Sequence, residues 1–131
     1  TKSSNIHNHG FIDIAGNKFA SIVEQCGFVI YPSASEGQSG AVLSAMATGV
    51  IPIVTRETGV DINDFGFILS DIRPQALSDV IINYSKMNPK ELKERSELSR
   101  KYIQNNHTIE NFTKTMYTHI SDFINNSCHY D

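Results

Sequence analysis

Two short apolar runs on either side of a helical pattern constrain the fold of this chain more than any other feature of its sequence. Phe28–Tyr31 is a continuous apolar run that stops at Pro32, and residues 51–55 form a second such run. Between them, residues 39–48 are almost wholly small or apolar, and Gly49 follows as a helix stop. Strand, helix and strand at this spacing predict a right-handed crossover in a parallel sheet.

Further patterns continue the alternation of strands and helices on both sides of this unit. Residues 5–11 are predicted to be a strand ending at Gly10, residues 17–25 a helix, and residues 67–69 a short strand. We therefore predict an α/β fold, with a parallel sheet and flanking helices.

The C-terminal part of the chain predicts helices only. Pro74 opens one helix at a position where its missing N–H costs nothing, and one buried face is expected to hold Leu77, Val80, Ile81 and Tyr84. Asn88 caps a second helix, whose many charges and weak apolar stripe predict a surface position. Thr108 caps the last helix, which carries a long apolar stripe of Ile109, Phe112, Met116, Ile120 and Phe123.

Size and charge narrow the functional classes. The 131 residues predict a single domain, spanning residues 1–131. The chain has a net charge of -3, whereas nucleic-acid-binding proteins are typically basic, so no nucleic-acid partner is expected. Cys26 and Cys128 are too few for a disulfide framework, which favours a reducing compartment, and the apolar surroundings of Cys26 predict a buried thiol.

The loop and helix start between the two apolar runs hold the residues best suited to chemistry. Glu36 follows the first run and precedes Gly37, Gln38, Ser39 and Gly40. Ligands of open α/β sheets bind outside the carboxyl ends of the strands. A helix N-terminus offers unpaired N–H groups to a diphosphate, whereas a carboxylate accepts hydrogen bonds from sugar hydroxyls. The segment therefore fits a ligand that joins phosphate to sugar.

Spacing alone leaves a plainer interpretation open. A loop of small residues before a buried helix is common in α/β folds, and Glu36 would also interact favourably with the helix dipole. His7 and His9 would point to one face of the predicted first strand, but no third ligand follows nearby, so no metal site is expected.

Several short sequence motifs follow one another along residues 5–124. They are Gly10-Phe11, residues 28–33 (FVIYPS), Ser35-Glu36-Gly37, Ala45-Met46-Ala47 with Gly49, residues 51–54 (IPIV), Gly66-Phe67, residues 74–77 (PQAL) and residues 107–112 (HTIENF). Together they resemble the C-terminal half of the family 4, GT-B-fold retaining glycosyltransferases, and their combination is specific although each piece alone is weak.

The resemblance implies a Rossmann-like domain that binds a nucleotide diphosphate sugar. A carbohydrate or lipid-linked acceptor would bind through an N-terminal domain that this chain lacks, so the isolated chain is expected to be inactive. The implied role is glycan or polysaccharide biosynthesis in the cytoplasm, with at most peripheral contact at the inner face of the membrane. No cofactor and no metal are implied.

The resemblance also assigns site residues. Its Glu-x7-Glu motif places the first acid at Glu36, near the donor sugar, while the second acid, which would hold the ribose, falls at Ser44. The N–H groups of Gln38, Ser39 and Gly40 would receive the leaving diphosphate. The family's diphosphate-binding Arg and Lys have no counterpart here, Arg56 is expected to be paired with an acid or solvated, and residues 58–63 are expected near the nucleotide base.

Ser44 leaves two hypotheses open. A serine hydroxyl is too short to bridge two ribose hydroxyls as a carboxylate does. The chain is therefore either the donor-binding half of a transferase or a catalytically inactive GT-B-like binding or scaffold module.

Overall fold

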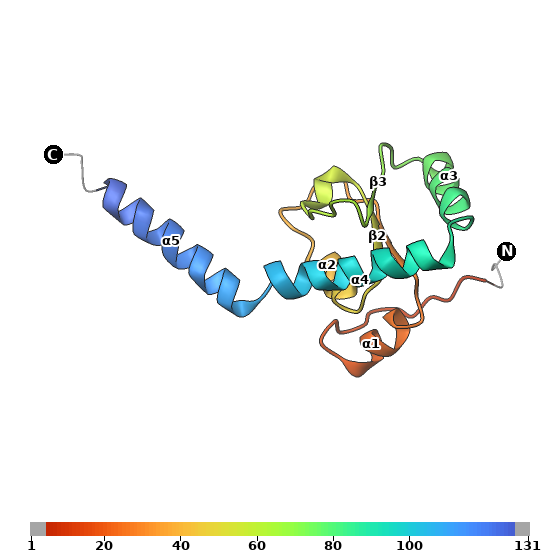
Figure 1. Ribbon diagram of the computed structural model, residues 1–131, viewed down its shortest axis with the longest axis horizontal. Coiled ribbons are helices and arrows are strands. Elements are labelled where there is room, and N and C mark those ends of the chain that lie inside the picture. The colour runs from red at the N-terminus through yellow and green to blue at the C-terminus, as the bar shows by residue number, and fades with distance from the viewer. Residues whose placement is uncertain (1–4, 128–131) are drawn as a thin grey trace.

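The computed structural model describes residues 5–127, in which one long helix extends from an α/β body (Figure 1). The elements in chain order are α1 (Asn17–Val23), β1 (Phe28–Tyr31), α2 (Gly40–Ala47), β2 (Ile51–Val54), the short 3-10 helix η1 (Arg56–Thr58), β3 (Phe67–Ile68), α3 (Pro74–Tyr84), α4 (Pro89–Asn106) and α5 (Ile109–Ser127). The predicted α/β fold with a helical C-terminal part is confirmed.

One parallel sheet organises the described residues. Its strands lie in the order β1-β2-β3, with Tyr31 opposite Val54 and Val54 opposite Ile68. All three strands therefore end at the same edge, and the loops that follow them meet there. Leu69 extends the third strand by donating its N–H to the Val54 carbonyl at 2.8 Å.

Helix α2 and the loop after β2 form the centre of the hydrophobic core. Val42 and Met46 of α2 are fully buried against Val54, and the core also contains Val60, Ile62 and Phe65. Gly49 ends α2 with a positive φ of 96°, a conformation that favours glycine, as the sequence predicted.

Helix α4 lies on the surface, as predicted, with most of its residues exposed and one face packed on the body. Its Ser99 is fully buried and donates its hydroxyl to the Val50 carbonyl at 2.8 Å, while Tyr102 and Ile103 pack against the core. The contact face of α4 contains a serine and a tyrosine rather than a run of aliphatic residues, which is why the apolar stripe looked weak.

The segment before α1 does not form the predicted strand. Within residues 5–16 the structure contains no strand, Gly10 has a positive φ of 64°, and Phe11 is 97% exposed. Residues 7–10, between Ile6 and Phe11, are polar or glycine, so the segment has little continuous apolar surface to pair with the sheet. The buried position predicted for Cys26 is also wrong, since its side chain is exposed; Cys128 lies outside the described residues.

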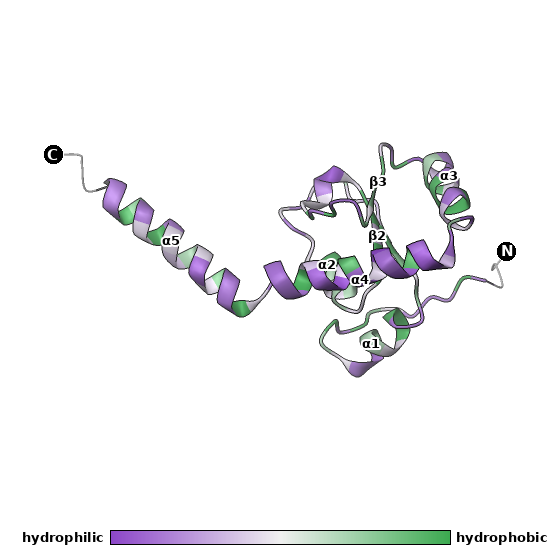
Figure 2. Ribbon diagram, viewed as in Figure 1, coloured by the Kyte–Doolittle hydropathy of each residue, from purple (hydrophilic) through white to green (hydrophobic). Residues whose placement is uncertain are grey.

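The helix caps follow the sequence, but the apolar face of α3 is less buried than predicted. Asn88 accepts a hydrogen bond from the Lys90 N–H, and Thr108 accepts one from the Asn111 N–H. On α3, Tyr84 stacks on Phe67, yet Ile81 remains 44% exposed. Helix α5 carries an apolar stripe along its length while standing away from the body (Figure 2).

In the described part of the chain, no helix is both long and apolar enough to cross a membrane.

Candidate functional site

The loop after β1 is held against the loop after β2 at the carboxyl edge of the sheet. The Thr55 hydroxyl donates a hydrogen bond to the Ser33 carbonyl at 2.5 Å, and the Ser39 N–H donates to the Thr58 carbonyl at 3.0 Å. Thr58 is fully buried and donates its own hydroxyl to the Thr55 carbonyl at 2.7 Å. These bonds fix both ends of the segment that contains Glu36.

Close backbone contact between Gly37 and Gly59 completes this arrangement. Gly59 has a φ of 64°, and a Cβ atom added to it would overlap the Gly37 carbonyl oxygen. Only glycine therefore fits at Gly59, both for its backbone conformation and for the space available. The Gln38 side chain also reaches the Gly59 carbonyl, at 3.5 Å.

Glu36 presents its carboxylate to solvent beside the end of β1. The Tyr31 hydroxyl donates a hydrogen bond of 2.9 Å to its Oε1 atom. Tyr31 is the last residue of β1, and its ring packs against the core, so the hydroxyl is held on a rigid element. A carboxylate restrained in this way keeps its second oxygen available to a ligand.

The N-terminus of α2 lies next to this carboxylate in the chain. Helical hydrogen bonding begins with the Leu43 N–H donating to the Ser39 carbonyl, so the amides of Gly40 and Ala41 precede the first bonded turn. The Ser39 N–H is already bonded to Thr58, and the Ser39 side chain is buried. The Ser39 N–H is therefore not a free donor, and the amides of Gly40 and Ala41 are the N–H groups left at the helix start.

Ser44 lies on the less buried side of α2. Gly40 and Ala47, at helical spacing from Ser44, are exposed, whereas Val42 and Met46 on the opposite side are fully buried. Ser44 itself is half-buried. Core packing therefore does not explain a serine at this position.

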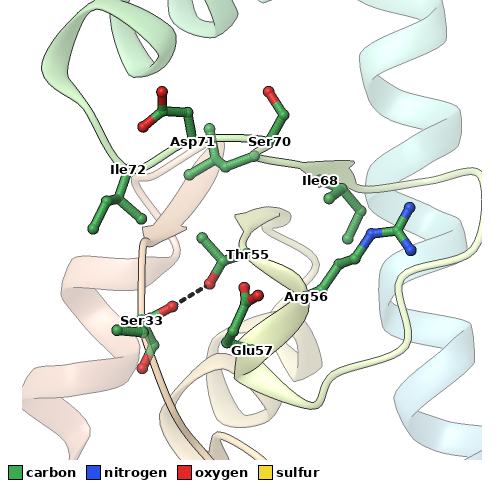
Figure 3. A pocket seen from close by; sticks show the side chains of 10 residues that line it. Ser33, Thr55, Arg56, Glu57, Ile68, Ser70, Asp71 and Ile72 are labelled. Carbon is green, nitrogen blue, oxygen red and sulfur yellow. Dashed lines mark hydrogen bonds between the residues drawn. The ribbon is translucent and has the colours of Figure 1, made fainter.

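A cavity of about 580 Å³ opens where the three strands end. Its walls come from the loops after β1, β2 and β3 and consist of Ser33, Ala34, Thr55, Arg56, Glu57, Ile68, Leu69, Ser70, Asp71 and Ile72 (Figure 3). Sequence reasoning missed this cavity, although every wall segment follows or ends a strand of the predicted parallel sheet. The cavity adjoins the Glu36 loop at Ser33 and Ala34 without including Glu36.

The charged residues of the cavity differ in how they are held. The Asp71 carboxylate accepts hydrogen bonds from the backbone N–H and the guanidinium of Arg73, and these interactions, the backbone bond first, lower the pKa of Asp71 below its ordinary value. Arg56 and Glu57 are exposed, and within residues 5–127 neither has an ion-pair partner. Arg56 is thus solvated, one of the two outcomes expected for it.

Two other predicted features do not line the cavity. Within residues 58–63, Thr58, Val60 and Ile62 are buried, whereas Asp61 and Asn63 are exposed, and the expected position of this segment near a nucleotide base stays a prediction. His7 and His9 are exposed, and among residues 5–127 no group of three or more His, Cys, Asp or Glu side chains gathers as a metal site would require.

Comparison with known protein families shows which family this chain belongs to. Residues 1–86 match the family described as glycosyl transferases group 1, which is 86 of the 131 residues. The chain belongs to the group 1 glycosyltransferases. No curated protein and no solved structure matches it. The group 1 match contains the whole sheet, Glu36 and every residue of the cavity, and it ends two residues after α3.

Proposed function

We propose that this chain is the donor-binding half of a retaining, family 4 type glycosyltransferase and that it binds a nucleotide diphosphate sugar at the carboxyl edge of the sheet. The observation that carries this proposal is the Glu36 carboxylate, held by Tyr31 in the loop that leads into α2 at Gly40. The carboxylate supplies a group for sugar hydroxyls, and the helix N-terminus supplies one for phosphate.

The opposite charges of the α2 N-terminus and of Glu36 suggest which part of the donor each would bind. The partial positive charge at the start of α2 favours the diphosphate, which gains negative charge as the bond to the sugar breaks. The amides of Gly40 and Ala41 would receive this charge, with Gly37 and Gly40 allowing close approach. Glu36 would accept hydrogen bonds from donor-sugar hydroxyls, and its negative charge would favour an oxocarbenium-like transition state.

The acceptor is assigned to a second domain. Helix α5 projects from the body, and its apolar side chains are largely exposed, with Phe112 at 67% and Tyr117 at 74% (Figure 1). An apolar face of this length is suited to packing against another folded unit. We assign it to the domain that binds a carbohydrate or lipid-linked acceptor, so residues 1–131 alone should not transfer sugar.

The proposed setting is glycan or polysaccharide biosynthesis in the cytoplasm. The exposed free thiol of Cys26 suits a reducing compartment. Contact with a membrane, where the acceptor is lipid-linked, would be peripheral.

Calorimetric titration of this chain tests the proposal directly. The ligands are UDP-glucose, UDP-galactose, UDP-N-acetylglucosamine, ADP-glucose and GDP-mannose, each compared with its nucleoside diphosphate. Glu36→Gln should weaken binding of the matching nucleotide sugar about tenfold, because hydrogen bonds to the charged carboxylate are lost, and leave the diphosphate alone unaffected. Glu24→Gln, a change of an exposed acid after α1, is the matched control.

The outcomes separate the proposal from its alternative. Equal weakening of nucleotide sugar and diphosphate in Glu36→Gln would mean that Glu36 does not contact the sugar. Failure of the folded chain to bind any of these ligands would favour the second candidate, an inactive GT-B-like binding or scaffold module. Ser44 in place of an acid is the observation that favours this second candidate.

A further inference from the structure

The cavity at the strand ends adjoins the Glu36 loop at Ser33 and Ala34 but does not include Glu36 or the start of α2. Helix η1 contributes to both regions: Arg56 and Glu57 line the cavity, while the Thr58 carbonyl accepts a hydrogen bond from the Ser39 N–H. The cavity volume of about 580 Å³ lies within the range of roughly 300–1,000 Å³ typical of small-molecule sites. Glu36 and the amides of Gly40 and Ala41, the groups proposed to bind the donor sugar and its diphosphate, do not line this cavity.

Solvent-exposed polar groups without a protein partner in the described part of the chain line the cavity. The Glu57 carboxylate has no hydrogen-bond or ion-pair partner among residues 5–127, and Figure 3 shows it turned toward Thr55 and Ser33. The Arg56 guanidinium on the opposite side is equally unpaired within the described residues. Together with the Ser70 hydroxyl they offer both donors and acceptors to a ligand.

Exposed apolar side chains lie beside these polar groups. Ile68 is 41% exposed and Ile72 is 58% exposed, and both line the cavity. Ligand sites commonly combine an apolar wall with a few polar groups that fix the orientation of the ligand. A pyranose ring has matching surfaces, because its C–H face is apolar and its edge carries hydroxyls.

Charge balance argues against an anionic ligand. Arg56 is the one basic residue that lines the cavity, and Glu57 offsets its charge. Asp71 adds a second carboxylate, which Arg73 neutralises by its ion pair. The cavity therefore holds no excess of positive charge that would attract a phosphate or a nucleotide.

We propose that this cavity binds a neutral saccharide through the Glu57 carboxylate, the Arg56 guanidinium and the exposed Ile68 and Ile72 side chains. The saccharide is one unit of the acceptor carbohydrate, held beside the Glu36 loop, while the rest of the acceptor lies on the second domain. Its identification as acceptor rests on the proposed glycosyltransferase function; the binding of the saccharide does not.

Nuclear magnetic resonance titration of the 131-residue chain tests the proposal. The probes are the methyl glycosides of glucose, galactose, mannose and N-acetylglucosamine, added without nucleotide. At least one should shift the backbone amide signals of Ser33, Glu57 and Ser70 in a saturable manner. Glu57→Gln should weaken that binding about tenfold, because a charged acceptor is replaced by a neutral amide. Glu24→Gln should leave the affinity unchanged.

Three results would overturn the proposal: no shift of the cavity amides with any glycoside at saturating concentration, unchanged affinity in Glu57→Gln, or larger cavity shifts with UDP than with every glycoside. The third result would make the cavity a nucleotide site. None of the three bears on the Glu36→Gln titration with nucleotide sugars, so failure of this inference is distinguishable from failure of the proposed function.

Discussion

Tyr31 and Glu36, five residues apart, are joined by a hydrogen bond of 2.9 Å from the tyrosine hydroxyl to the carboxylate. The tyrosine belongs to the sheet and packs on the core, whereas the glutamate belongs to an exposed loop. The hydrogen bond therefore restrains the Glu36 carboxylate, which the proposed donor site requires, relative to the sheet.

Tyr31→Phe removes this hydrogen bond while keeping the ring in the core. We expect the affinity for the nucleotide sugar to fall about threefold to tenfold, because the carboxylate must be ordered when the ligand binds. The free energy of unfolding should change little, since Glu36 is exposed. Calorimetry and urea denaturation measure the two effects, with Tyr117→Phe on α5 as control. A loss of stability without a loss of affinity would contradict this positioning role.

Gly59→Ala tests the contact that holds the two loops together. The positive φ and the overlap with the Gly37 carbonyl should each destabilise the variant, by about 1–3 kcal/mol in total. Gly27→Ala is the matched control, because a Cβ atom there meets no atom within 4 Å. Urea denaturation compares the two variants. Equal stabilities would show that the loops separate readily in solution.

Ser99→Ala tests whether α4 is bound to the body as the structure shows. The variant loses a buried hydrogen bond to the Val50 carbonyl, and we expect a loss of about 1–2 kcal/mol in the free energy of unfolding. Ser78→Ala removes a similar bond to a backbone carbonyl on exposed α3, so it should change stability by less than about 0.5 kcal/mol. Similar effects of both variants would argue that α4 detaches before global unfolding.

Much of the fold could be predicted because its signals are local. The apolar runs of β1 and β2, the small residues of α2 and the caps at Asn88 and Thr108 act through neighbours in the chain. The predicted strand at residues 5–11 failed because a strand depends on pairing with a partner, which the sequence pattern does not reveal. The burial of Ser99 on α4 could not be predicted for a related reason, since Ser99 becomes a core residue only through its contact with Val50.

The candidate site could be predicted in part. Glu36 and the start of α2 were identified from the loop between two predicted structural elements. The hydrogen bond from the Ser39 N–H to the Thr58 carbonyl could not be predicted, because Thr58 lies after the next strand. The cavity was missed for the same reason, since Ser33, Glu57 and Ser70 come from three loops that only the sheet brings together.

The pKa of Asp71 gives a prediction that depends on pH. Because the folded-state pKa is lowered below its ordinary value of 3.8, the stabilisation from Asp71 is fully present above that value and is lost as the pH falls through the folded-state pKa. In Arg73→Ala the guanidinium is lost, but the backbone N–H bond, the larger cause, remains. The Asp71 pKa should therefore rise only in part, and nuclear magnetic resonance titration measures it. A return to 3.8 would show that the side chain alone is responsible.

Ser44→Glu decides between the two candidate functions. The variant should fold normally, because Ser44 lies on the less buried side of α2 with exposed Gly40 and Ala47. A carboxylate there restores the second acid of the Glu-x7-Glu motif, and if the chain handles a donor, the affinity for the nucleoside diphosphate should rise about threefold to tenfold through bonds to the ribose hydroxyls. Ser44→Gln, which has the same length without the charge, separates the carboxylate from added contact area. If the glutamate gives no gain in calorimetry, residue 44 does not face a ribose, and the inactive binding module becomes the better description.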